Sequence, residues 1–96
     1  MKVELSEQVV EFVRRLAPPP RRLVRAALRG LGKGHGDIKS LEGPLDGYCR
    51  LRVHGYRVIF AYAERRTIQC IYAERRGIVY EVFAQMVNER LAGRGE

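Results

Sequence analysis

The chain has no tryptophan, only two cysteines and only three lysines, and each shortage narrows what it can do. Cys49 and Cys70 lack the paired spacing of a zinc site, so we expect no metal and no cofactor. Both fall among apolar residues of predicted strands, where reduced core cysteines are the main interpretation and a cross-strand disulfide is the alternative. None of the three lysines lies beyond position 39.

Long apolar runs are also missing. No segment reaches the roughly 20 apolar residues that cross a bilayer, and no signal-peptide pattern opens the chain. We therefore expect a cytoplasmic protein that has no membrane partner. The 96 residues suffice for one domain, residues 1–96, with a single modest core.

Arginine supplies most of the positive charge. Lys and Arg total 18 against 11 acidic residues, which gives a net charge of +7. Between positions 48 and 80, seven arginines stand against two glutamates, so this span holds +5 of that excess. The planar guanidinium fork binds phosphate and stacks on rings, and a basic excess of this kind favours a polyanionic partner, either nucleic acid or an acidic protein.

Residues 48–54 alternate between apolar and polar with the period of a half-buried strand. The apolar positions are Cys49, Leu51 and Val53, and the opposite positions are Tyr48, Arg50, Arg52 and His54. A sheet face with guanidinium groups and aromatic rings suits a phosphate backbone and unstacked bases. By the same alternation, Arg57 lies on a strand face that it shares with apolar residues. A charged side chain in such a position needs a hydrogen-bond partner, so we expect Arg57 to have a specific one.

The remaining pattern predicts the other elements. The expected elements are a strand over residues 2–5, helices over about 7–17 and 19–29, strands over about 48–53, 56–63 and 67–73, and a helix over about 81–91. Ser6 is the expected N-cap of the first helix, and three prolines separate it from the second. We expect residues 31–47 to form a glycine-rich loop, residues 78–80 a short extended piece, and His54-Gly55 a tight turn with Gly55 at positive φ.

The resulting fold class is α+β, in the order β-α-α-β-β-β-α. Two helices joined by a short turn form an antiparallel hairpin, which we expect to pack on a small, mostly antiparallel sheet. Four arginines lie on the second helix, at Arg21, Arg22, Arg25 and Arg29. They are expected to form a solvated face, or alternatively to contact ribosomal RNA or an acidic protein.

The order of elements and four short segments carry a family resemblance. The segments are Leu41-Glu42-Gly43, YCRLRV at 48–53, GYRVIF at 55–60, and Arg75-Arg76 followed by IVY at 78–80. Together they resemble the RelE/ParE superfamily of toxins from type II toxin–antitoxin pairs, and they favour its RelE-like branch. The resemblance covers nearly the whole chain and implies the RelE-like fold.

The resemblance implies an endoribonuclease that cuts mRNA in the ribosomal A site without a metal, by attack of the 2′-hydroxyl group. It assigns Arg57 and Arg75 as phosphate clamps, Arg50 to a position that is often lysine, and Tyr80 as the residue that orients or stacks on the substrate. Arg76 is the alternative to Arg75. Contacts with RNA are expected from Arg52, Arg76 and Tyr48.

The predicted strands hold no lysine to accept the proton of the 2′-hydroxyl group. Arginine keeps its proton at neutral pH and is a poor base. His54, which titrates near neutrality, is the predicted replacement, with Glu64 and Glu74 as alternatives.

Two other functions remain open alongside RNA cleavage. One is a ParE-like toxin that traps gyrase, and the other is a member that only binds its antitoxin. In each case the resemblance implies a cognate acidic antitoxin and a toxin–antitoxin hetero-oligomer. RNA cleavage adds mRNA and ribosomal RNA as partners.

Overall fold

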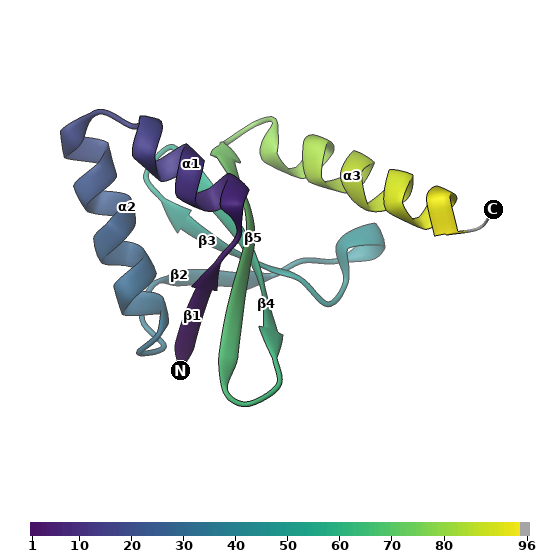
Figure 1. The fold of residues 1–96 in the computed structure, drawn as a ribbon, viewed down its shortest axis with the longest axis horizontal. Coiled ribbons are helices and arrows are strands. Elements are labelled where there is room, and N and C mark those ends of the chain that lie inside the picture. The colour runs from purple at the N-terminus through teal and green to yellow at the C-terminus, as the bar shows by residue number, and fades with distance from the viewer. Residues whose placement is uncertain (95–96) are drawn as a thin grey trace.

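A computed structural model describes the backbone of residues 1–94 and the side chains of residues 1–89. The elements are β1 (Lys2–Leu5), α1 (Glu7–Arg15), α2 (Pro18–Leu31), β2 (Asp37–Ser40), the short 3-10 helix η1 (Gly43–Leu45), β3 (Cys49–Val53), β4 (Tyr56–Ala63), β5 (Thr67–Arg75) and α3 (Val79–Arg94) (Figure 1). The predicted α+β class, the helical hairpin and the three central strands are confirmed. None of the described helices is long and apolar enough to cross a membrane.

Two segments differ from the sequence prediction. Residues 37–40, expected within a loop, form the edge strand β2, where Ile38 pairs with Leu51 of β3. The prediction missed this strand because it is four residues long, is flanked by glycines and has one apolar residue. Residues 78–80, expected to be extended, instead include the start of α3 at Val79, because Val79 and Phe83 together pack on the sheet.

The tight turn between β3 and β4 also differs in detail. Val53 pairs with Tyr56, so the turn has the two residues predicted. The positive φ, however, belongs to His54, at 53°, and Gly55 is not among the positive-φ glycines. A non-glycine residue in this region is uncommon, and histidine is one of the residue types that adopt it most often.

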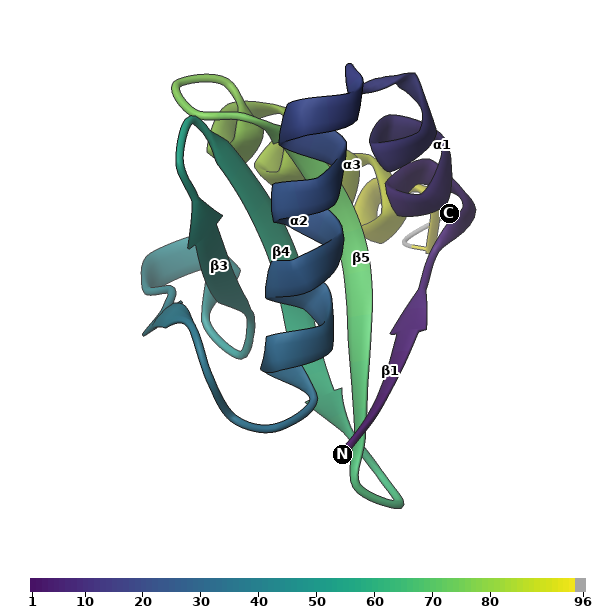
Figure 2. The same cartoon turned by 90° about the vertical axis from the view of Figure 1, so that its left-hand side faces the viewer.

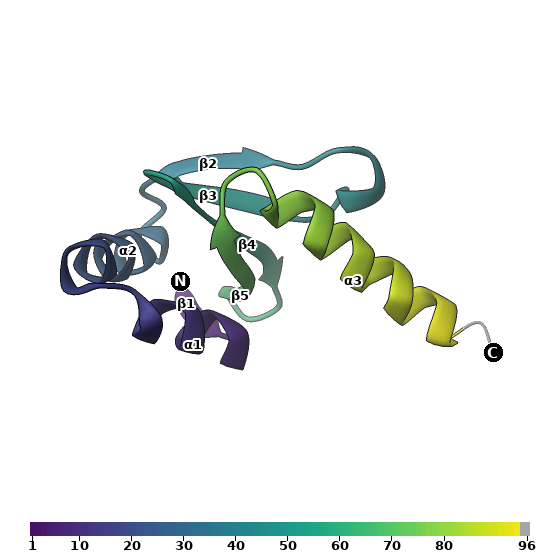
Figure 3. The same cartoon turned by 90° about the horizontal axis from the view of Figure 1, so that it is seen from above.

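The five strands form one mixed sheet in the order β1-β5-β4-β3-β2. β1 runs parallel to β5, and the other neighbours are antiparallel. The hairpin of α1 and α2 covers one face of the sheet, and α3 starts on the other face and extends away from the body (Figures 2 and 3). The register shifts between Ile59 and Phe60, which pair with Tyr72 and Cys70, so Ile71 is the extra residue of a β-bulge in β5.

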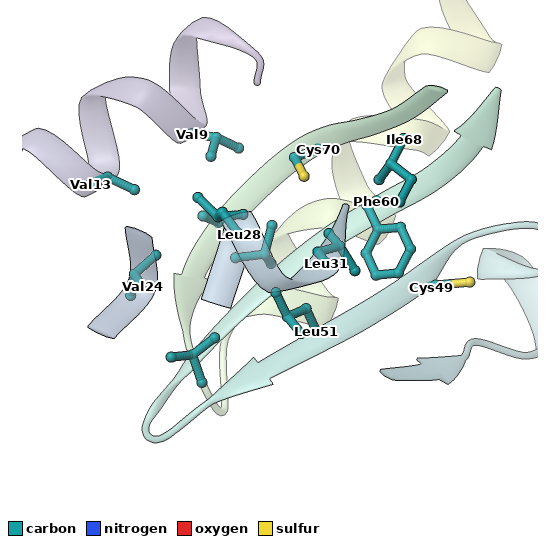
Figure 4. Packing of buried hydrophobic residues seen from close by; sticks show 13 residues of the cluster. Val9, Val13, Val24, Leu28, Leu31, Cys49, Leu51, Phe60, Ile68 and Cys70 are labelled. Atoms are coloured by element: carbon teal, nitrogen blue, oxygen red, sulfur yellow. The ribbon is translucent and has the colours of Figure 1, made fainter. Parts of the chain in front are cut away.

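The main core lies between the helical hairpin and the sheet (Figure 4). Its centre is Phe60, which pairs with Cys49 on one side and Cys70 on the other. The two cysteines therefore lie on strands separated by β4, and both are free and buried, which agrees with the main interpretation of reduced core cysteines. Burial raises the pKa of the Cys70 thiol to about 11.

Helix α1 completes the edge of β5 that β1 leaves open. β1 ends at Leu5, whereas β5 continues to Arg75. The side-chain amide of Gln8 takes the place of a strand there: Nε2 donates to the Ala73 carbonyl oxygen at 2.7 Å, and Oε1 accepts from the Ala73 N–H at 2.8 Å. Ser6 Oγ accepts from the Val9 N–H and donates to the Ile71 carbonyl oxygen, so the predicted N-cap also ties α1 to β5.

Candidate functional site

Basic residues gather on the sheet face opposite the helical hairpin. Cross-strand partners in antiparallel strands share a face, so the register defines two rows. The rows are Asp37–Arg52–Arg57–Glu74 and Lys39–Arg50–Ile59–Tyr72. We call the surface formed by Lys39, Arg50, Arg52 and Arg57 the arginine face. The alternation predicted for Arg50 and Arg52 agrees with this arrangement.

Asp37 bridges the two arginines of β3. Nη1 of Arg50 lies 3.0 Å from Oδ1 of Asp37, and Nε of Arg52 lies 2.7 Å from Oδ2. Nη1 of Arg50 also donates to the Asp37 carbonyl oxygen at 2.7 Å. The hydrogen bond from Arg50, with the charges of both arginines, lowers the pKa of Asp37 below its ordinary value. The Arg50 side chain is only 14% exposed, so it is held in one orientation, whereas that of Arg52 is 55% exposed.

Arg57 folds back on the β3–β4 turn. Its Nη1 donates to the carbonyl oxygens of His54 and Tyr56, at 2.8 and 2.9 Å. The two carbonyl groups are the specific hydrogen-bond partners that we expected for Arg57. They carry no charge, and no ion pair of Arg57 occurs among the described side chains, so the positive charge of Arg57 is not neutralised there. His54 itself is exposed in this turn, at the end of β3 beyond Arg52.

Tyr80 lies beside Arg50. It belongs to the first turn of α3 and lines a pocket of about 420 Å³ together with Arg50 and Lys39. The other lining residues are Ser40, Leu41, Glu42 and Leu45. The structure therefore brings together two of the predicted site residues, Arg50 and Tyr80, although they are far apart in the sequence.

Lys39 and Glu42 line the same pocket and are candidate residues that the sequence did not predict. Lys39 lies on β2, directly across from Arg50, and Glu42 precedes η1. Lys39 was set aside because its segment was expected to be a loop. The alternation of Asp37, Ile38 and Lys39 was the available signal, since it matches the period of a half-buried strand.

Arg75 lies apart from Arg57. The register pairs Arg57 with Glu74 and places Arg75 opposite Tyr56, on the side of the helical hairpin. There Arg75 lines a separate pocket of about 500 Å³ with Phe12 and Leu16. Arg76 follows in the next turn, and its N–H donates to the Gly55 carbonyl oxygen at 2.9 Å. The two predicted phosphate clamps are thus not on one face of the sheet.

Three other candidates have mainly packing or peripheral positions. The Tyr48 ring is half-buried and meets the Phe83 ring edge-on, with centroids 4.9 Å apart. Glu74 Oε1 accepts a hydrogen bond from the Arg75 N–H. Glu64 lies in the β4–β5 turn, at the opposite end of β4 from His54.

The candidate site consists mainly of positively charged side chains, those of the arginine face. Among the described residues, no group of three His, Cys, Asp or Glu side chains could hold a metal ion. Guanidinium groups beside an ammonium group stabilise a phosphate that gains negative charge during a reaction. A carboxylate and a phenol in the same pocket add a proton acceptor and a hydrogen-bonding group.

Comparison with known proteins shows which solved structures share the fold of this chain. No family model matches the sequence, and no curated protein matches it significantly. Among solved structures, the chain is similar to the toxin–antitoxin complex RelBE2 from Mycobacterium tuberculosis, with 18% identity and a TM-score of 0.66 over 78% of this chain and 96% of that chain. The isolated RelE toxin of E. coli gives 16% identity and a TM-score of 0.65 over 90% and 97% of the two chains.

A third similar structure is archaeal. The RelB–RelE complex from Methanococcus jannaschii gives 19% identity and a TM-score of 0.64, covering 82% of this chain and 96% of that one. At these identities the likeness is one of fold, and it confirms the RelE-like architecture that the sequence motifs predicted.

Proposed function

We propose that the protein is the toxin of a type II toxin–antitoxin pair and that it cuts ribosome-bound mRNA without a metal. The observation that carries this proposal is the pocket where Arg50, Lys39 and Tyr80 meet, on the same sheet face as Arg52 and Arg57. The RelE-like fold supports the toxin class. The toxin acts in the cytoplasm, where its acidic antitoxin binds and neutralises it.

The reaction is a transesterification within the RNA. The 2′-oxygen attacks the adjacent phosphorus, the bond from phosphorus to the 5′-oxygen breaks, and a 2′,3′-cyclic phosphate and a 5′-hydroxyl result. Arg50 stabilises the charge of the pentavalent phosphate, and Arg52 and Arg57 bind the flanking phosphates. Tyr80 orients the nucleotide in the pocket.

Two groups of the pocket handle the protons. The Glu42 carboxylate takes the proton of the 2′-hydroxyl group, since it is the one acidic side chain among the described residues that line this pocket. The Lys39 ammonium group returns a proton to the leaving 5′-oxygen. His54, the base predicted from sequence, is in the turn at the end of β3 and does not line the pocket.

The test is cleavage of mRNA on translating ribosomes, in the presence of EDTA, with mapping of the product ends. The wild-type protein should give 2′,3′-cyclic phosphate ends. Arg50→Ala and Glu42→Gln should each slow cleavage by about 10²–10³-fold, the loss typical of one transition-state or acid–base group. Arg14→Ala, which removes an exposed arginine of α1, is the matched control and should cleave at the wild-type rate. Intact mRNA with the wild-type protein would refute the proposal.

One observation favours the ParE-like alternative. Arg57 and Arg75, the two predicted phosphate clamps, lie on opposite sides of the sheet. Two clamps arranged in this way suit RNA cleavage less well than two clamps on one face would. If mRNA stays intact while expression causes DNA breaks and loss of supercoiling activity, the protein is a gyrase-binding toxin.

A further inference from the structure

A second pocket lies on the side of the sheet that faces the helical hairpin, between helix α1 and the end of strand β5. It has a volume of about 500 Å³, and we call it the α1 pocket. Phe12 and Leu16 supply its apolar wall, and Arg75 is the arginine that β5 contributes. The reaction proposed for the pocket of Arg50 and Tyr80, on the other face of the sheet, makes no use of the α1 pocket.

Arg75 is the basic group of the α1 pocket that is available to an anion. The carboxylate of Glu11 pairs with Arg14 and Arg15, at 3.4 and 3.7 Å. Glu74 Oε1 accepts a hydrogen bond from the backbone N–H of Arg75 at 3.0 Å. The guanidinium group of Arg75 itself forms no ion pair among the described side chains. A phosphate that enters the pocket can therefore bind this group.

An aromatic ring lies in the same pocket as Arg75. The half-buried ring of Phe12 meets the ring of Tyr56 edge-on, with centroids 5.8 Å apart and an angle of 73° between the planes. Tyr56 is in turn the cross-strand partner of Arg75. A ring that binds a base by stacking, together with a guanidinium group that binds phosphate, is the combination that single-stranded nucleic acid requires.

Three arginines connect the arginine face with the α1 pocket around the end of the sheet. Arg57 lies on the arginine face, and its Nη1 donates to the His54 carbonyl oxygen of the β3–β4 turn. The N–H of Arg76 donates to the Gly55 carbonyl oxygen, so the segment after β5 lies beside that turn at one end of the molecule (Figure 2). Arg75 precedes it on the helical-hairpin side. Positive charge is thus continuous from one side of the sheet to the other.

We propose that an RNA strand bound on the arginine face turns around this end of the sheet and places a flanking nucleotide in the α1 pocket. The phosphate of that nucleotide binds Arg75, and its base stacks on Phe12 beside Leu16. This inference rests on the proposed RNA cleavage, since it assigns the path of the same strand. The strand register separates Arg57 from Arg75, and a strand that passes over the end of the sheet contacts both.

The test measures binding of a 2′-O-methyl oligoadenosine decamer, which has no free 2′-hydroxyl group and so is not cut. Arg75→Gln and Phe12→Leu should each weaken its binding about fivefold or more, as read by fluorescence anisotropy. The control is Arg65→Gln, the same change at an exposed arginine of the β4–β5 turn, which should bind like the wild type. Arg75 is exposed, so its variant keeps the fold even if Phe12→Leu does not. Equal binding by the Arg75 and Arg65 variants would overturn the proposal.

A titration then tests whether one strand occupies both sides of the sheet. The ¹⁵Nε signals of Arg57 and Arg75 should shift together as the decamer is added, with one common Kd. A 2′-O-methyl adenosine dinucleotide should bind at least about tenfold more weakly, because it cannot make both contacts within one molecule. Saturation of the two signals at different decamer concentrations would mean two independent sites and would refute the path. These measurements involve no cleavage, so they are read separately from the ribosome assay, in which intact mRNA refutes the proposed function.

Discussion

The Nη1 atom of Arg50 donates to both the carbonyl oxygen and the carboxylate of Asp37, at 2.7 and 3.0 Å. A guanidinium group that is bound twice by the same neighbouring residue has little freedom to turn. Asp37 thus fixes Arg50 toward the pocket that Tyr80 lines, and it neutralises part of the positive charge of β3. An acidic residue inside a basic face here serves to orient the arginines.

The ion pairs of Asp37 should be lost in acid. The pKa of Asp37 is lowered in the folded state, so the pairs are intact above its ordinary value of 3.8 and break as the pH falls through the lowered value. The ¹⁵Nε chemical shift of Arg52 should change over that range. In Asp37→Asn the transition should be absent, and its persistence in that variant would show that another group causes it.

Arg57 and Arg75 should contribute unequally to RNA cleavage. Arg57 shares a face with Arg52, whereas Arg75 is on the helical-hairpin side. We therefore expect Arg57→Ala to slow single-turnover cleavage by about 10²-fold and Arg75→Ala by less than about tenfold. Equal losses of cleavage rate in the two variants would mean that both arginines contact the same phosphate, although the strand register places them on different sides of the sheet.

The position of Arg75 shows where sequence reasoning fails. Alternation along β3 correctly predicted which residues are buried, because Cys49, Leu51 and Val53 keep a strict period of two. In β5 the extra residue Ile71, between the partners of Ile59 and Phe60, shifts the register by one residue, and the side chains beyond it change faces. Nothing in the local sequence signals this bulge, so Arg75 could not be placed from the pattern.

Lys39 shows a different limit. A four-residue edge strand buries little apolar surface, so its sequence carries a weak signal, and it forms because β3 offers an unpaired edge. The pairing places Lys39 next to Arg50. The sheet face of Arg50 could thus be predicted from the alternation of β3, while the position of Lys39 beside it depended on tertiary pairing.

Two glycines near β2 should differ in their tolerance of alanine. Gly36 has a φ of +130°, and a Cβ there would lie 2.7 Å from Leu51 Cδ1, whereas Gly34 has a φ of +78° and nothing within 4 Å. Gly34→Ala should cost only the left-handed backbone penalty, about 1 kcal/mol. Gly36→Ala adds a steric clash and should lower the free energy of unfolding by about 2–4 kcal/mol. Urea denaturation measures both, and equal costs would contradict the close approach.

Cys70 should react slowly with thiol reagents in the folded protein. Burial raises the pKa of its thiol to about 11, so little thiolate is present at pH 8. Iodoacetamide at that pH should leave Cys70 unmodified in the native protein and modify it in urea, as read by peptide mass. Rapid native modification would contradict the burial of this strand.

Gln8 should stabilise the fold through Ala73, since its amide satisfies both backbone groups of that residue. Ala73 is fully buried, so removing the amide leaves an N–H group and a carbonyl oxygen without partners. Gln8→Ala should therefore lower the free energy of unfolding by about 2–3 kcal/mol, and Gln69→Ala, at an exposed glutamine of β5, by less than about 0.5 kcal/mol.

The variant Gln8→Glu supplies an acceptor for the Ala73 N–H group but, when ionised, no donor for the Ala73 carbonyl oxygen. Its deficit should shrink as the pH falls below about 4, because the protonated carboxyl group regains a donor. A deficit that is independent of pH would mean that the side chain of residue 8 stabilises α1 by packing and not by completing the edge of β5.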